Sequence, residues 1–89
     1  MSTREKIGEY LEDALFLDPP ETFDDCIIGI AERAGGMTVV AYDRTLCIEA
    51  LMRDGKTSRE EAEEYFEFNT VSAWVGDGTM VFIDTRWAE

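Results

Sequence analysis

Residues 26–43 read CIIGIAERAGGMTVVAYD, and this stretch decides the fold class. Two short apolar runs, 26–31 and 38–42, are rich in β-branched and aromatic residues and flank the turn-prone pair Gly35-Gly36. This pattern predicts a β-hairpin. A helix over residues 25–34 is the competing interpretation, because Phe23, Ile27 and Ile30 also fit one helical face and periodicity cannot decide so short a run.

The segment before the hairpin carries the signals of a helix start and a helix stop. Ser2 and Glu5 have the spacing of a capping box, followed by apolar residues at helical intervals, which predicts a first helix over about residues 3–15. The helix must end before Pro19-Pro20, since neither proline donates a backbone hydrogen bond. A stiff linker is predicted to begin there.

Two further helices are predicted after the hairpin. Asp43 is a suitable N-cap for a helix over roughly 44–54, with Gly55 as the left-handed residue that closes it. Ser58 and Glu61 form a second capping box, which starts a third helix at Arg59. The sequence does not show where this third helix ends.

Residues 79–83 are predicted to form a final strand, and residues 84–89 a tail. The hairpin and this strand are short and far apart, which disfavours a parallel α/β repeat. We therefore expect a single α+β domain over residues 1–89, with residues 1–20 as an N-terminal helix and linker. It should pack about three helices on a three-stranded sheet that is antiparallel or mixed, and mainly antiparallel.

Composition limits the partners of the protein. Its 89 residues are 45% apolar and 11% aromatic, which favours one globular unit, and the net charge is −12 with a pI near 4.2. Phosphate backbones and anionic lipid should repel such a chain. A helix-turn-helix over residues 43–69 is disfavoured as a DNA reader, since its second helix has only Arg59 as a cation. With no signal peptide and no long apolar run, a cytoplasmic protein that binds neither nucleic acid nor membrane is expected.

Catalytic chemistry has little support. The chain has no His, and Cys26 and Cys47 lie alone in apolar runs, which predicts buried thiols in a reducing compartment. We predict no catalytic residue, metal or cofactor. The alternative is a metal-dependent enzyme of nucleotide or nucleic-acid metabolism, because four aspartates fall near predicted strand ends, although turn and cap chemistry explains each of them: Asp24, Asp25, Asp43 and Asp84.

Acidic residues concentrate on two predicted helices. Four on the third helix recur at i, i+3, i+4 and i+7 and so share one face, and others form a second patch on the first helix. These residues are Glu60, Glu63, Glu64 and Glu67 on the third helix, and Glu5, Glu9 and Glu12 on the first. One interpretation is a solvated face that keeps the protein soluble. The other is a binding surface for a basic partner. Such an acidic surface could imitate the phosphates of a nucleic acid.

Aromatic residues add candidates for partner binding. Phe68 and Trp74 fall outside the main apolar face of the third helix, and exposed aromatic residues often anchor protein interfaces. Trp87, in the tail, is the aromatic residue most expected to be exposed. Asn69 lies on the apolar face, where its amide would need hydrogen-bond partners.

Several segments together resemble a family of small uncharacterised proteins of phages and prophages. The resemblance rests on Val39–Asp43, on Glu60–Asn69 with its sequence EYFEFN, and on Ala73–Gly76. The chain departs from the family pattern at Pro19-Pro20 and at Met80, where proline is expected. The resemblance implies a viral setting and supplies no catalytic residues.

These observations favour a small acidic accessory protein of phage type that binds a host or viral protein with a basic surface. Inhibition of a host-defence or nucleic-acid-handling factor is the leading hypothesis. A metal-dependent enzyme and a structural or assembly component of the virion are the alternatives. Pairing of two copies through an uncovered sheet edge is also open.

Overall fold

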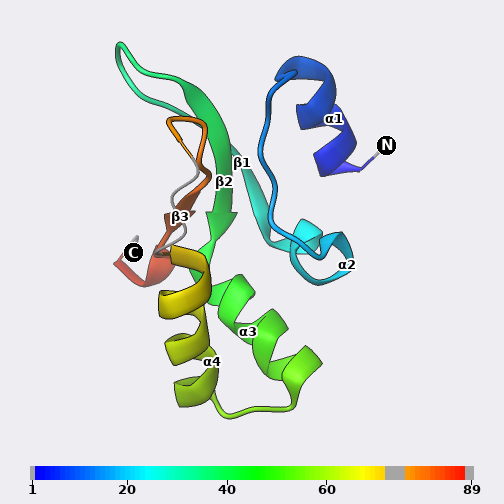
Figure 1. The fold of residues 1–89 in the computed structure, drawn as a ribbon, viewed down its shortest axis with the longest axis vertical. Helices are drawn as coiled ribbons and strands as arrows, with labels where there is room; N and C mark the ends of the chain where they lie inside the picture. The colour runs from blue at the N-terminus through cyan, green and yellow to red at the C-terminus, as the bar shows by residue number, and fades with distance from the viewer. Residues whose placement is uncertain (1, 72–75, 88–89) are drawn as a thin grey trace.

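The computed structural model describes residues 2–71 and 76–87. In chain order the elements are α1 (Thr3–Tyr10), α2 (Pro20–Phe23), a 3-10 turn (Asp24–Cys26), β1 (Ile27–Glu32), β2 (Thr38–Asp43), α3 (Arg44–Gly55), α4 (Arg59–Phe66), a π-helical turn (Glu67–Val71), β3 (Val81–Ile83) and a last 3-10 turn (Thr85–Trp87). Within these described residues they form a small α+β domain with four α-helices and a three-stranded mixed sheet (Figure 1).

The hairpin is confirmed. Strands β1 and β2 pair antiparallel, with Ile30 opposite Val40, so the helical interpretation of residues 25–34 is wrong. The turn depends on Gly35, whose φ of 74° lies in the left-handed region that favours glycine. The N–H of the next residue, Gly36, donates to the carbonyl of Arg33 at 2.8 Å and closes the turn.

The third strand makes the sheet mixed, because β3 pairs parallel with β2. The order is β1-β2-β3, and Tyr42 of β2 lies opposite Phe82 of β3. A parallel pair needs a connection of a dozen residues or more, and the segment from Arg44 to Met80 supplies it with two antiparallel helices. The sheet is thus mixed, with one antiparallel and one parallel pair, and is less antiparallel than expected. Strand β3 is also shorter than predicted, since Thr79 belongs to a turn in which its N–H donates to the carbonyl of Gly76 at 3.0 Å.

Strand β2 forms the centre of the core. Its residues from Val39 to Tyr42 are all buried, because both faces of the strand are covered. Phe66 of α4 is fully buried and meets the ring of Phe82 edge-on, with centroids 5.0 Å apart. The sheet therefore joins the helical pair α3–α4, which lies at its end in Figure 1. None of the helices in the described part of the chain has the length and apolar character needed to span a lipid bilayer.

Helix α1 ends earlier than predicted, at Tyr10 rather than near residue 15. Leu11 is already extended, and its N–H closes the helix on the carbonyl of Ile7 at 2.7 Å. Beyond it the chain runs along the core, where the N–H of Leu17 donates to the hydroxyl of the buried Tyr42 at 2.8 Å. Leu11 and Ala14 pack against the core from this non-helical segment, so tertiary packing overrides its helical pattern.

The predicted stiff linker at Pro19-Pro20 instead begins a fourth helix, the short α2. Pro20 is its first residue, a position where proline is favoured because its fixed φ fits the helix and its missing N–H is not needed. Thr22 and Phe23 of α2 are buried. The segment thus contributes to the core.

Helix α3 begins as predicted and ends one residue later. The carboxylate of Asp43 accepts the N–H of Leu46 at 3.1 Å, which confirms the N-cap. Gly55 stays helical, and the left-handed residue is Lys56, with φ of 52°. The closing hydrogen bond runs from the Lys56 N–H to the carbonyl of Met52, so the left-handed position falls on a lysine.

Candidate protein-binding surface

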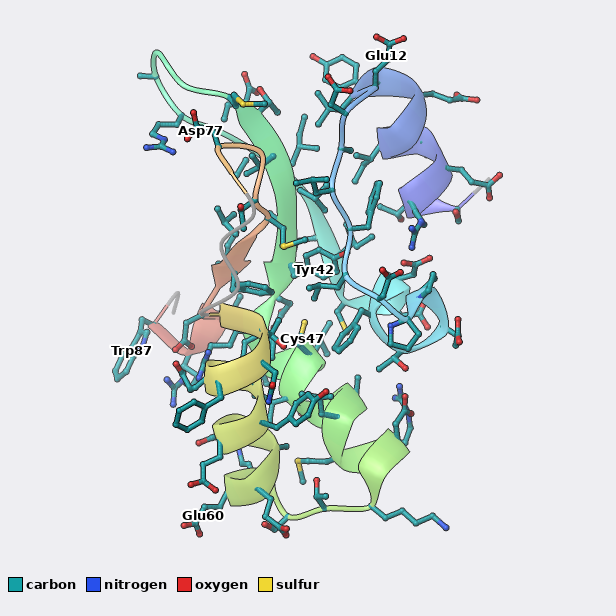
Figure 2. The ribbon with its side chains drawn as sticks, in the orientation of Figure 1. Glu12, Tyr42, Cys47, Glu60, Asp77 and Trp87 are labelled. Atoms are coloured by element: carbon teal, nitrogen blue, oxygen red, sulfur yellow. The ribbon has the colours of Figure 1, made fainter. Side chains whose placement is uncertain are left out.

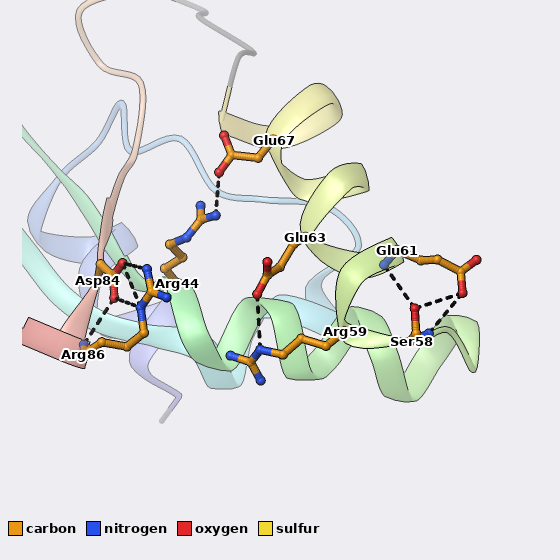
Figure 3. A network of polar contacts seen from close by, with 8 residues as sticks. All are labelled: Arg44, Ser58, Arg59, Glu61, Glu63, Glu67, Asp84 and Arg86. Atoms are coloured by element: carbon orange, nitrogen blue, oxygen red, sulfur yellow. Dashed lines mark hydrogen bonds and ion pairs between the residues drawn. The ribbon is translucent and has the colours of Figure 1, made fainter.

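Helix α4 carries the predicted acidic face, and its start is set by the predicted capping box. The Ser58 hydroxyl accepts the N–H of Glu61 at 3.2 Å, and the Glu61 carboxylate accepts the N–H of Ser58 at 3.3 Å (Figure 3). Ala62 and Phe66 are buried against the core, which turns another side of the helix outward. We call this side the outer acidic face; it consists of Glu60, Glu63, Glu64 and Glu67.

Arginines offset half of this face. The Nε of Arg59 donates to Glu63 at 3.2 Å, and the guanidinium of Arg44, the first residue of α3, binds Glu67 (Figure 3). Within residues 2–71 and 76–87, the side chains of Glu60 and Glu64 form no ion pair or hydrogen bond. These two carboxylates are exposed and four residues apart, so they are neighbours on the helix. The uncompensated charge of the face is concentrated on them.

The tail brings another ion pair close to this face. Arg86 donates from its Nε to Asp84 at 2.9 Å, and these hydrogen bonds are the main reason why the pKa of Asp84 falls to about 2. The pKa of Arg86 is raised, first by Asp84 and also by the charge of Glu63. The end of the described chain therefore borders the outer acidic face.

Exposed aromatic residues lie in the π-helical turn after α4 and in the tail. Phe68, in the π-helical turn, is 79% exposed, and Trp87 is 81% exposed and points outward from the tail (Figure 2). The exposure predicted for Trp87 is confirmed. Trp74, the other predicted anchor, lies outside the described residues. Asn69 is exposed rather than buried, and its amide donates to the carbonyl of Tyr65 at 3.2 Å, which supplies the partner its sequence position lacked.

The second acidic patch lies at the other end of the molecule. Figure 2 shows Glu12 and Glu60 at opposite ends of the long axis, along which the protein extends 37 Å. Because α1 ends at Tyr10, Glu12 lies in the following turn rather than on the helix. The carboxylate of Glu5 is part of the α1 capping box, where hydrogen bonds from Ser2 lower its pKa. The patch of Glu5, Glu9 and Glu12 therefore does not form one continuous surface with α4.

The four aspartates considered for a metal site have separate surroundings. Asp24 pairs with Arg4 at 3.1 Å, and Asp43 and Asp84 are engaged by the α3 backbone and by Arg86. Asp25 is exposed. Across the part of the chain that the structure describes, no three His, Cys, Asp or Glu residues come together as metal ligands.

Both cysteines are free and buried, as predicted. Burial is the main cause that raises the pKa of both the Cys26 and the Cys47 thiol. A raised pKa disfavours the thiolate, which is the nucleophilic form. The pair therefore has the properties of core packing.

Sequence reasoning missed a groove of about 1040 Å³ bounded by the segment 15–19, α2, α3 and α4. Its apolar lining includes Leu15, Leu17 and Leu51, and Tyr65 is 55% exposed at the groove. The sequence held one signal, the apolar run 15–17 between acids and a proline pair. Such a run contributes more apolar surface than one helical face can bury.

Comparisons with known proteins add no family to this geometry. No protein-family model, no curated protein and no solved structure matches the chain. The resemblance to phage proteins therefore stays a prediction, and function is inferred from the charge, exposure and contacts of the described residues.

Proposed function

We propose that this protein is a small acidic accessory protein, of phage type, that binds a basic surface of a host or viral protein through α4. Binding would inhibit its partner, with a host-defence or nucleic-acid-handling factor as the expected class. The outer acidic face supplies the charge and Phe68 an apolar contact. The exposed aromatic residue matters because charge alone steers association more than it holds a complex together.

The observation that supports this proposal most is the uncompensated pair Glu60 and Glu64. Arginines form ion pairs with other carboxylates, including Glu63 and Glu67 of the same face, yet these two exposed neighbours have none among the described residues. Like charges at this spacing destabilise a helix by roughly 0.2–0.5 kcal/mol. A basic partner would relieve this repulsion on binding.

The proposal is tested by capture of a partner with the tagged protein from infected-host lysate, followed by mass spectrometry. The wild type should recover a basic protein at about 0.1 M salt and lose it at about 0.5 M salt, because salt screens exposed charges. The double variant Glu60→Lys/Glu64→Lys should weaken binding roughly 10- to 30-fold, since two weak attractions become repulsions.

The matched control reverses two other exposed carboxylates, Glu32 and Glu49, which lie outside both acidic patches. Glu32→Lys/Glu49→Lys changes the net charge by the same amount, so it separates a local surface from overall charge. Equal loss of binding in both double variants, or no loss with Glu60→Lys/Glu64→Lys, would contradict the proposal.

A further inference from the structure

The groove is lined mainly by apolar side chains and opens to solvent beside Tyr65. Leu15, Leu17, Leu51 and Met80 are half-buried around it, and Tyr65 is 55% exposed. Its volume of about 1040 Å³ is at the upper end of the range for small-molecule sites. A concave site with a mainly apolar lining and a few polar groups is typical of a binding site.

Hydrogen bonds hold one wall and one end of the groove in place. On one wall, the N–H of Leu17 donates to the hydroxyl of Tyr42 at 2.8 Å. At the end of the groove, the hydroxyl of Thr22 donates to Asp54 at 2.5 Å and joins α2 to α3. The groove is therefore formed before any partner binds, which lowers the entropy lost on binding.

The charge of the groove is one-sided. Asp18, Asp54 and Glu61 belong to its lining, and none of the described lining residues is a Lys or Arg. Asp54 pairs with Arg53 at 3.5 Å, and the Glu61 carboxylate accepts the Ser58 N–H. Among the described residues, Asp18 is the lining carboxylate with no ion pair or hydrogen bond, and an uncharged apolar ligand would leave it unmatched. A second copy of this chain would bring a net charge of −12 and would be repelled.

We propose that this groove docks a short amphipathic segment of a partner protein, with a few apolar side chains entering it and a Lys or Arg facing its acidic lining, above all the carboxylate of Asp18. An amphipathic segment in a preformed groove is a recurrent mode of peptide recognition. Tyr65 is the expected anchor, because a half-exposed tyrosine offers a large rigid surface at the lip.

This site is distinct from the outer acidic face, although both belong to α4. Tyr65 and Glu61 line the groove and lie on one side of the helix, one turn apart, whereas Glu60 and Glu64 lie on another side. The two surfaces can therefore be changed separately, and the groove proposal does not depend on the proposed function.

The test is a selection of random peptides displayed on a surface, with the whole chain as bait. Enriched peptides should combine apolar residues with Lys or Arg. Their affinity is then measured by fluorescence anisotropy for wild type, Tyr65→Ala and Asp18→Lys. Truncation of an anchor residue costs more than about 1 kcal/mol of binding free energy, so Tyr65→Ala should bind at least roughly five-fold more weakly.

Two matched controls separate the groove from general attraction to an acidic protein. Phe68→Ala removes another exposed aromatic ring, and Glu60→Lys/Glu64→Lys reverses charges outside the groove; both should bind the peptides as the wild type does. The proposal is overturned if no peptide is enriched, if enriched peptides lack basic residues, or if Tyr65→Ala and Phe68→Ala bind them equally.

Discussion

Replacement of Tyr42 by Phe removes one hydroxyl and leaves the buried ring in place. That hydroxyl accepts the N–H of Leu17 at 2.8 Å, so the variant leaves a partly buried donor without its acceptor. Loss of this bond should lower the free energy of unfolding by about 1–2 kcal/mol. For a domain of this size the change corresponds to a fall in Tm of roughly 5–15 °C.

The same hydroxyl gives a second, pH-dependent readout. Burial raises the pKa of Tyr42 to about 12, against about 10 for tyrosine in an unfolded chain. Below pH 10 both states keep the proton, and as pH rises further the unfolded state releases it first, so stability falls. Between pH 9 and pH 11 the wild type should lose about 1.4 kcal/mol more than Tyr42→Phe.

Urea denaturation followed by far-UV circular dichroism measures both effects, and hydrogen exchange reports the Leu17 amide directly. The control is Tyr10→Phe, the same chemical change at a side chain that is 74% exposed, and it should leave stability within about 0.5 kcal/mol. The reasoning is refuted if Tyr42→Phe is as stable as wild type and the Leu17 amide stays protected.

Three further predictions concern the core, a helix end and the surface charge. Phe66→Ala empties a fully buried site beside Phe82 and should lower the free energy of unfolding by about 3–5 kcal/mol in urea denaturation; a loss below about 1 kcal/mol would mean the ring is not in the core. Lys56→Gly removes the steric strain of a left-handed backbone at a lysine, so it should raise the free energy of unfolding by about 0.5 kcal/mol and with it the Tm. A lower Tm would argue against that backbone conformation. Salt should raise Tm by the equivalent of about 1 kcal/mol, since it screens repulsion within a chain of net charge −12, and a Tm that falls with salt would contradict the account.

Local chemistry made part of this fold predictable. The capping box of Ser2 and Glu5 and the N-cap Asp43 act within a few residues, so the sequence contains all the information they need. The hairpin is similar, because its turn depends on Gly35 and its strands are adjacent in sequence. Each of these predictions is confirmed.

Contacts between distant segments were not predictable in the same way. After the early end of α1, Leu11 and Ala14 pack against the core from a non-helical segment, and the parallel position of β3 depends on how α3 and α4 return the chain. The pattern that placed Glu67 on the acidic face was right about the helix but could not show Arg44 beside it. The uncompensated charge of the candidate site is therefore limited to Glu60 and Glu64, whereas the sequence suggested all four glutamates.

Site-specific photocrosslinking in host cells tests the central claim most directly. A photoreactive amino acid replaces Glu64 on the outer acidic face or, as the control, the exposed Glu49 of α3. Position 64 should crosslink to a protein with a basic surface, and position 49 should not. Crosslinks to the same partner from both positions, or from position 49 alone, would show that the partner does not bind through the outer acidic face.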